Sequence, residues 1–220
     1  MKSKLLVFAL IVAILVGGIF YWRAHRYDKA AEVAPVASGT ETAYFSGGCF
    51  WCTEADFEKL PGVTEAISGY SGGTTENPTY TSVSSHTTGH LESVEVRYDP
   101  KQVAYEKLVE YFFSSIDPTD PNGQFIDQGD SYRSAVFYKN ETEKMIAEEE
   151  MKRLSESGAY DKPLVTALLP FQKFYLAEDY HQDYWKKNSV RYKYYRGGSG
   201  RDQYLEHICQ IRETKNVPCL

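Results

Sequence analysis

The sequence has few cysteines and no excess of positive charge, and each shortage excludes a class of protein. Four cysteines among 220 residues are too few for a small domain that disulfides hold together. A net charge of -6 argues against a nucleic-acid partner, which would require a basic stripe. The sequence also lacks internal repeats and strongly biased composition, which excludes collagen-like, solenoid and mostly disordered chains.

What remains is the composition of a globular protein that is rich in aromatic residues. The chain is 42% hydrophobic and 25% charged, and its 15% of aromatic residues includes 18 tyrosines. A single tyrosine therefore carries little functional information by itself. The length accommodates one domain with a core of ordinary size and an appendage. We expect the protein to be a monomer.

An uninterrupted apolar run occupies residues 5–22 near the N-terminus. Its length reaches the lower limit for a helix that crosses a bilayer, and it exceeds the usual signal-peptide core of about 7–15 residues. Tyr21 and Trp22 at its end suit the interface between membrane and water. We therefore predict a membrane anchor over residues 1–29 in a single-pass protein, with the following domain on the outer (periplasmic or extracytoplasmic) face. Secretion after signal cleavage is the alternative.

The rest of the chain divides into a linker, a domain and a tail. Residues 30–41 are small or polar and are punctuated by proline and glycine, which is typical of a flexible tether. We expect the domain to cover residues 42–205 and the C-terminal tail to cover 206–220.

Patterns within the domain predict an α+β fold. Alternating runs bounded by turn residues indicate strands, and apolar residues spaced by three or four indicate helices. The predicted strands cover 42–45, 63–70, 91–99, 134–138 and 164–169, and the predicted helices cover 49–60, 105–115, 141–157 and 177–187. We expect a two-layer sheet-and-helix sandwich with long functional loops, preceded by the N-terminal transmembrane helix.

The stretch GGCFWC at residues 47–52 is the segment most suited to chemistry. Two glycines permit a tight turn into a helix, at whose N-terminus Cys49 would lie. Free N–H groups and the helix dipole there lower the pKa of a thiol and make it reactive at neutral pH. Cys52 follows on the same face, a spacing typical of thioredoxin-like redox sites. The alternative is that both cysteines are small buried hydrophobic residues.

Acidic residues crowd the expected first turns of the same helix: Glu54, Asp56 and Glu58. The helix dipole favours negative charge at that end.

No metal site is predicted. The other two cysteines, Cys209 and Cys219, do not form the close pair that a four-cysteine zinc site requires. His86 and His90 have a metal-like spacing of four, but the Thr-Thr-Gly between them argues against a helix that would place both on one face.

Seven short motifs follow one another along the domain. They are GGCFWC at 47–52, LPGV at 60–63, GYSGG at 69–73, NPTY at 77–80, TGHLESVEVRYDP at 88–100, DQGDSYRS at 127–134 and FYLAEDYHQDYW at 174–185. Together they resemble the A-type peptide methionine sulfoxide reductases, in the usual order of that family. The resemblance implies thiol-dependent reduction of methionine-S-sulfoxide, in proteins and free, as a repair of oxidative damage.

The resemblance also implies roles for individual residues. Cys49 matches the nucleophile, which attacks the sulfoxide sulfur and becomes a sulfenic acid. Glu92 matches the general acid, and apolar surroundings would raise its pKa and keep it protonated. Tyr80 and Tyr132 match the tyrosines that donate hydrogen bonds to the sulfoxide oxygen. Without the resemblance, Glu92 would be read as a solvated carboxylate, and Tyr80 and Tyr132 as packing residues.

Further residues match the walls of the site. Asp127 matches an acidic residue of its polar network, and Phe50 and Trp51 match the apolar wall that receives the ε-methyl group of the substrate. We assign His181 only a structural role. The basic and aromatic run 186–196 is interpreted as a solvated face.

Regeneration of the nucleophile departs from the best-known pattern of the family. Many relatives carry glycine where this chain has Cys52, and they resolve the sulfenic acid with C-terminal cysteines. We favour Cys52 as the resolving residue because its spacing needs no long-range motion. Cys209 and Cys219 remain alternatives, since a mobile tail could swing onto the site. The resemblance implies no bound cofactor and reduction by thioredoxin or a thioredoxin-like protein.

Two other functions remain open at this point. A dithiol oxidoreductase acting on protein disulfides would need Cys49 and Cys52 but not Glu92. A non-enzymatic sensor would keep a reactive Cys49 and tolerate the loss of Glu92.

Overall fold

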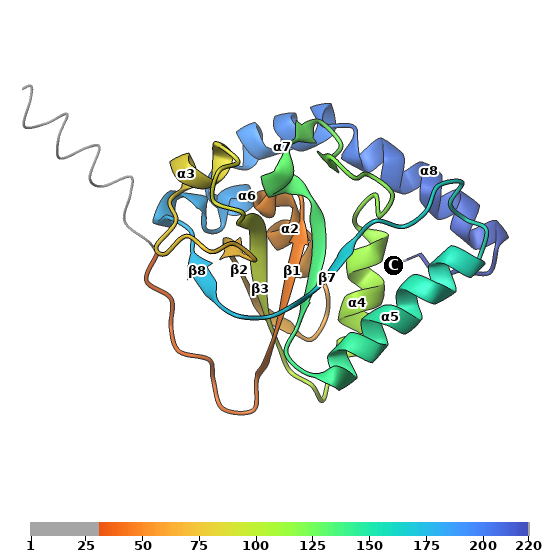
Figure 1. The fold of residues 1–220 in the computed structure, drawn as a ribbon, viewed down its shortest axis with the longest axis horizontal. Helices are drawn as coiled ribbons and strands as arrows, with labels where there is room; N and C mark the ends of the chain where they lie inside the picture. The colour runs from red at the N-terminus through yellow and green to blue at the C-terminus, as the bar shows by residue number, and fades with distance from the viewer. Residues whose placement is uncertain (1–30, 220) are drawn as a thin grey trace, which may run out of the picture.

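The computed structural model describes residues 31–219, which form one mixed sheet with helices around it (Figure 1). The sheet has six strands in the order β7-β6-β1-β3-β2-β8, and a separate pair is formed by β4 and β5. The strands are β1 (Glu41–Gly47), β2 (Val63–Ser71), β3 (Leu91–Tyr98), β4 (Gly123–Gln124), β5 (Asp127–Gln128), β6 (Ser134–Tyr138), β7 (Ala167–Pro170) and β8 (Phe174–Leu176). All pairings in the sheet are antiparallel except that of β6 with β7.

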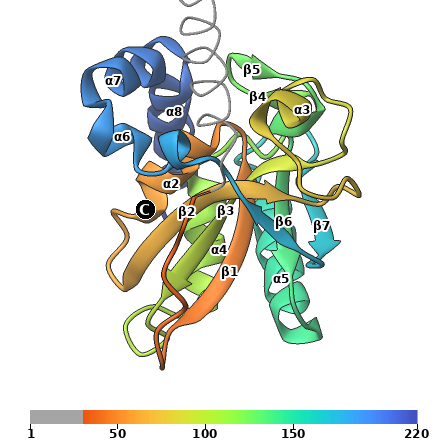
Figure 2. The ribbon, with the colours of Figure 1, turned by 90° about the vertical axis from the view of Figure 1, so that its left-hand side faces the viewer.

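The helices lie around the sheet and at one of its ends. They are α2 (Phe50–Phe57), α3 (Tyr80–Ser84), α4 (Tyr105–Ser114), α5 (Glu141–Glu156), α6 (Tyr184–Lys187), α7 (Ser189–Gly198) and α8 (Arg201–Thr214), with short 3-10 helices at Asp130–Tyr132 and Asp179–His181. Figure 2 shows α3, the β4-β5 pair and α6 to α8 gathered at the same end of the sheet, near α2. Segments far apart in sequence therefore meet there.

The central strand β3 is buried on both faces. Successive side chains point to opposite faces of a strand, so Glu92 shares a face with Val94 and Val96. These two valines belong to the main hydrophobic core, where Phe112 of α4 packs against Phe45 of β1 at a ring distance of 5.0 Å. Glu92 therefore extends from the same face as the core residues, which explains why a charged residue type is buried here.

The predicted fold class is corrected in one part, the transmembrane helix before the domain, which the described residues do not contain. Across residues 31–219 no helix is long and apolar enough to cross a membrane. The apolar run 5–22, on which the prediction rested, lies outside the described residues. That run only reached the lower limit of the length that a span requires, so length and purity alone were a weak basis.

The predicted location is corrected by the same finding. A single-pass membrane protein with its domain on the outer face, and the membrane contact through residues 5–22, depended on that helix. The fold that the structure shows is a mixed α/β domain built on one six-stranded sheet.

The predicted helix over 177–187 is also wrong. The segment forms only the 3-10 turn Asp179–His181 and the single turn α6. Asp183 between them is in the left-handed conformation with φ 52°, which interrupts a right-handed helix. The Gln182 side chain instead bonds to the backbone of Ser68 in β2. The C-terminal tail, for which no helix was predicted, is helical as far as Thr214.

Candidate active site at the start of α2

A tight turn between β1 and α2 presents Cys49. Gly48 has φ 81°, and a side chain there would place its Cβ 2.5 Å from Cβ of Gln124. Only glycine fits such a turn. Cys49 is the N-cap residue of α2, and its carbonyl accepts hydrogen bonds from the amides of Cys52 at 3.1 Å and Thr53 at 3.3 Å. The predicted position of this cysteine at a helix N-terminus is confirmed.

A small open pocket of about 100 Å³ lies over Cys49. The residues around it are Cys49, Phe50, Trp51, Tyr80, Glu92, Asp127, Tyr132 and Tyr195. All seven residues that the sequence placed in the catalytic and substrate-binding roles thus surround one pocket, together with one more tyrosine.

Glu92 is a buried carboxyl that lines the same pocket as Cys49. One of its oxygens, Oε2, accepts a hydrogen bond from the amide of Phe50 at 3.0 Å. Burial raises the pKa of Glu92 to about 8, and the charges of Asp127 and Cys52 act in the same direction, against the hydrogen bond from Phe50. A carboxyl with this pKa is mostly protonated at pH 7, so it can donate a proton inside the pocket.

The two thiols titrate as a pair. Both cysteines are free and buried. Burial raises the pKa of Cys49 well above its ordinary value, and the hydrogen bond with Cys52 raises it further. The pKa of Cys52 falls to about 7, chiefly through its hydrogen bond with Cys49, with a smaller contribution from Arg201. This direction for Cys49 is opposite to the one predicted from the helix terminus, because burial disfavours a thiolate at this sulfur.

Two tyrosine hydroxyls face the pocket from different segments. Tyr80 is the first residue of α3, and its amide donates to Oε1 of the buried Glu178 at 2.8 Å. Tyr132 ends a 3-10 helix after β5. Burial raises the pKa of Tyr80 to about 12 and raises that of Tyr132 as well. Both phenols therefore keep their protons and can act as hydrogen-bond donors at neutral pH.

The aromatic wall of the pocket is held from behind. The ring of Trp51 stacks on Tyr184 at 3.7 Å with an interplanar angle of 5°. Its indole N–H donates to Nδ1 of His181 at 3.0 Å. Burial lowers the pKa of His181 to about 3, so the imidazole is neutral and can accept this bond. The structural role expected for His181 agrees with these contacts.

Sequence reasoning missed the contribution of α7. The run 186–196 was interpreted as a solvated face, but Tyr192 is buried and Tyr195 lines the pocket. The Tyr195 hydroxyl donates a hydrogen bond to Oδ2 of Asp127. Burial raises the pKa of Asp127, which this bond opposes. The spacing of Tyr192 and Tyr195 by three was the available signal, since it places both on one side of a helix.

Two arginines near Cys52 were also missed. Arg201, the first residue of α8, is fully buried, and its guanidinium donates to the carbonyls of Gly47 and Ser115, each at 2.7 Å. Arg196 donates to Asp56 at 2.8 Å. Their positive charges favour the thiolate of Cys52. Arg201 thereby links the C-terminal helix to the turn that carries the nucleophile.

The remaining cysteines are bonded to each other. A disulfide joins Cys209 in α8 to Cys219. The segment between them is anchored because Arg212 is buried and donates to the carbonyl of Phe113, and Val217 is buried in the main core. In this state neither cysteine has a free thiol to offer Cys49.

The acidic residues of α2 do not lie where the sequence placed them. The first turn of the helix contains none. Glu54 and Asp56 are buried in its second half, and Glu58 is the C-cap residue. They therefore do not interact with the N-terminal end of the dipole, and Asp56 pairs with Arg196 instead.

The two candidate metal histidines make separate contacts. His86 bonds to Ser131 through Nδ1 at 3.0 Å, whereas His90 bonds to the amide of Gly73 and the carbonyl of Thr75. They do not converge on a common point.

Comparison with known proteins agrees with this geometry. A sequence profile of the family "Peptide methionine sulfoxide reductase" matches residues 41–213. The protein "Peptide methionine sulfoxide reductase MsrA" of Bacillus licheniformis is 51% identical over 171 residues, which are 78% of this chain and 94% of the relative. The MsrA/MsrB protein of Vibrio cholerae is 52% identical over 180 residues, 82% of this chain, but the chain spans only 48% of that relative.

A solved structure leads to the same family. Methionine sulfoxide reductase A of Corynebacterium diphtheriae superposes with a TM-score of 0.61 at 36% identity, over 70% of this chain and 77% of that one. The chain therefore belongs to the peptide methionine sulfoxide reductase family, of the A type, and catalyses thiol-dependent reduction of methionine sulfoxide.

Proposed function

We propose that Cys49 is the nucleophile and Glu92 the general acid for reduction of methionine-S-sulfoxide. The observation that carries this proposal is the enclosure of a thiol and a carboxyl with a pKa of about 8 in one pocket. Sulfoxide reduction needs both, because the sulfur must be attacked while the departing oxygen gains a proton. We further propose that the chain acts as a monomer, with its catalytic domain over residues 42–205 and its tail over 206–220.

The first step moves the oxygen from substrate to enzyme. The Cys49 sulfur attacks the sulfoxide sulfur, Glu92 protonates the sulfoxide oxygen, and the hydroxyl group ends on Cys49. The products are methionine and a Cys49 sulfenic acid, so the substrate sulfur is reduced by two electrons and the cysteine is oxidised by two. In the resting pair, the proton of Cys49 can pass to the Cys52 thiolate through their hydrogen bond.

The hydroxyls and rings of the pocket position the substrate for that step. Tyr80 and Tyr132 are proposed to donate hydrogen bonds to the sulfoxide oxygen, which would strengthen as that oxygen gains negative charge. The Tyr195 hydroxyl holds Asp127 in the polar part of the pocket. Phe50 and Trp51 are proposed to enclose the ε-methyl group, since methyl–aromatic contact favours burial of that group. A pocket this small and open suits a single side chain of an oxidised protein or peptide.

The second step regenerates the nucleophile. The Cys52 thiol, which holds the proton taken from Cys49 in the first step, attacks the sulfenic sulfur. Its proton joins the departing hydroxyl group, so water leaves and a Cys49–Cys52 disulfide forms. The hydrogen-bonding contact between the two side chains and the lowered pKa of Cys52 support this choice. Pairing of Cys209 with Cys219 counts against the alternative resolving residues. Thioredoxin or a thioredoxin-like protein then reduces the disulfide by dithiol exchange, and no bound cofactor is needed.

Replacement of Glu92 by glutamine tests the acid. The amide keeps the shape and the hydrogen bond from Phe50 but supplies no proton, so we expect turnover of methionine-S-sulfoxide to fall by about 10²–10⁴-fold. Reduction of a small disulfide substrate by the Cys49–Cys52 pair should stay within a few-fold. Equal turnover of the sulfoxide by E92Q and the native chain would contradict the proposal and would favour direct dithiol chemistry.

A further inference from the structure

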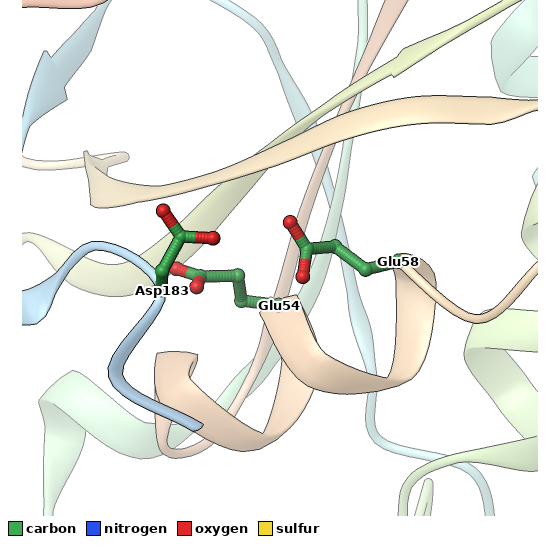
Figure 3. Close-up of side chains that lie close together, drawn as sticks. All are labelled: Glu54, Glu58 and Asp183. Atoms are coloured by element: carbon green, nitrogen blue, oxygen red, sulfur yellow. The ribbon is translucent and has the colours of Figure 1, made fainter. Parts of the chain in front are cut away.

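Three carboxyl groups meet beside the second half of α2, away from the catalytic turn. Glu54 and Glu58 lie one helical turn apart, and Asp183 is the N-cap residue of α6. Figure 3 shows Glu54 and Asp183 extending toward one another and Glu58 turned toward the same space. One oxygen from each lies within 4.8 Å of the other two. Like charges one turn apart destabilise a helix, and burial raises the pKa of Glu54 to about 8, so the repulsion is relieved either by a proton on Glu54 or by a cation.

Glu54 is the member without adequate compensation. Its side chain is fully buried. Oε2 accepts a hydrogen bond from the Ser68 hydroxyl, but no donor among the described residues is hydrogen-bonded to Oε1. A buried oxygen that lacks a partner costs free energy, because it has lost its hydration and gained nothing in return. The carboxyl group that carries this oxygen extends toward that of Asp183 (Figure 3).

Lys186 neutralises only part of the cluster. Its ammonium bonds to Asp183 at 2.8 Å and to Glu58 at 2.9 Å. Its side chain is 48% exposed, so it can withdraw into water at little cost. Trp185 donates its indole N–H to Glu58 at 2.7 Å, which orients that carboxylate. The observed contacts of the Lys186 ammonium are with Asp183 and Glu58, and none is with Oε1 of Glu54.

We propose that Glu54, Glu58 and Asp183 bind a Ca²⁺-type divalent cation that takes the place of the Lys186 ammonium. The donors are all oxygen atoms, which hard cations prefer. With Ca²⁺–oxygen distances of about 2.4 Å, two ligands of one ion lie at most about 4.8 Å apart. Each pair of these carboxyl groups is therefore close enough to share an ion, and small side-chain rotations would bring all three to it.

Solvent can reach the cluster from the side of Glu58 and Asp183. A cavity of about 210 Å³ is lined by Glu58 and Asp183 and also by Glu65, Asp179 and Gln182. It admits the water ligands that Ca²⁺ needs to reach six to eight oxygens.

The ion would join α2 to α6. Glu54 and Glu58 belong to the helix that Cys49 caps, and Asp183 directly precedes Tyr184, which stacks on Trp51. Binding at this point therefore stabilises the support of the aromatic wall, without any ligand entering the catalytic pocket. The proposal concerns an ion site and stands apart from the roles of Cys49 and Glu92.

Terbium luminescence tests the site directly. Tb³⁺ has the ligand preference of Ca²⁺, and Trp185 lies against Glu58, so excitation of the indole should sensitise the bound lanthanide. We expect the full chain to give saturable luminescence that Ca²⁺ displaces. The D183N variant should bind Ca²⁺ more than about tenfold more weakly, since a charged ligand is lost.

The lysine supplies the decisive comparison. K186M removes the competing ammonium and should bind Ca²⁺ roughly tenfold more tightly. K173M removes an ammonium from another exposed carboxylate pair, Lys173 with Glu76, and should leave the affinity unchanged. W185F should lose the luminescence while Ca²⁺ still raises the melting temperature. Equal affinity in K186M, K173M and the native chain, or no loss in D183N, would show that the cluster is only an ion-pair network.

Discussion

The two cysteine pairs of this chain differ in every property that decides reactivity. Cys49 and Cys52 are free thiols at the start of a helix, hydrogen-bonded to each other and adjacent to a pocket. Cys209 and Cys219 are already bonded, at the end of the chain. The first pair is accompanied by a buried acid, Glu92, with a raised pKa. The second pair joins two points of a segment that the core anchors.

The difference teaches that spacing alone does not identify a redox pair. Ten residues separate Cys209 from Cys219, and three separate Cys49 from Cys52, yet either spacing permits a disulfide. What distinguishes the first pair is its surroundings. Arg201 favours a thiolate there, and Glu92 can supply a proton. The predictions below test whether catalysis depends on those surroundings, in order of decreasing effect.

Loss of the nucleophile should have the largest effect. In C49S the hydroxyl that replaces the thiol is too weak a nucleophile to attack the sulfoxide, so methionine formation should fall to background even in a single turnover. Release of methionine, followed by chromatography, measures this. C209S is the matched control and should form one methionine per chain. Methionine formation by C49S above background would place the attacking sulfur elsewhere.

Loss of the resolving residue should separate the two steps. In C52S the first step remains possible, so one methionine should still form per chain, leaving a Cys49 sulfenic acid. Steady-state turnover with thioredoxin should drop at least about 10²-fold, because an adjacent thiol is replaced by encounters in solution. Comparing the burst with the steady state measures both quantities. Undiminished turnover by C52S would shift the resolving role to Cys209 or Cys219.

The pH dependence should follow the acid of the first pair. Glu92 must hold its proton to donate it, so the single-turnover rate should fall about tenfold per pH unit above its pKa of about 8. In E92Q the rate should be low throughout and should lack this decline. Stopped-flow measurement from about pH 6 to about pH 10 would test the sign. The rate is expected to rise as Cys52 ionises near its pKa of about 7, but a rate that keeps rising above the pKa of Glu92 in the native chain would contradict the prediction.

Replacement of the second pair should change stability more than activity. The C209S/C219S double variant should turn over sulfoxide within about twofold of the native chain. Its free energy of unfolding should fall by about 2–3 kcal/mol, the value expected for opening a loop of this size. Urea denaturation followed by circular dichroism measures the change. A large loss of turnover with unchanged stability would contradict this prediction and would show that Cys209 and Cys219 take part in the reaction cycle.

The sequence predicts the strands and helices whose pattern is local. The alternation over 91–99 and 134–138 and the helical spacing over 105–115 and 141–157 agree with β3, β6, α4 and α5. In β3, α4 and α5 the apolar residues line one face, which packs on the main core, so their period identifies the element. The strand β6 is instead a short apolar run that is buried on both faces. The same reasoning wrongly predicted a helix over 177–187. There the side chain of Gln182 forms hydrogen bonds with the backbone of Ser68, and Asp183 adopts a left-handed conformation.

The site was predictable through its motifs but not through their surroundings. Cys49, Glu92 and Tyr80 come from the turn before α2, from β3 and from α3, and only the fold brings them to one pocket. Tyr195 and Arg201 lie in helices that sequence reasoning interpreted as a solvated face or did not predict. Their roles depend on contacts with residues far away in the chain, such as Asp127 and Gly47. No local pattern reports such contacts.

Disulfide mapping after one turnover is the most direct test of the account. The fully reduced full-length chain would receive one equivalent of methionine-S-sulfoxide without reductant, be blocked with an alkylating agent, and be mapped by mass spectrometry. We predict one equivalent of methionine and a bridge between Cys49 and Cys52. A bridge from Cys49 to Cys209 or Cys219, or methionine formed while Cys49 remains a free thiol, would contradict it.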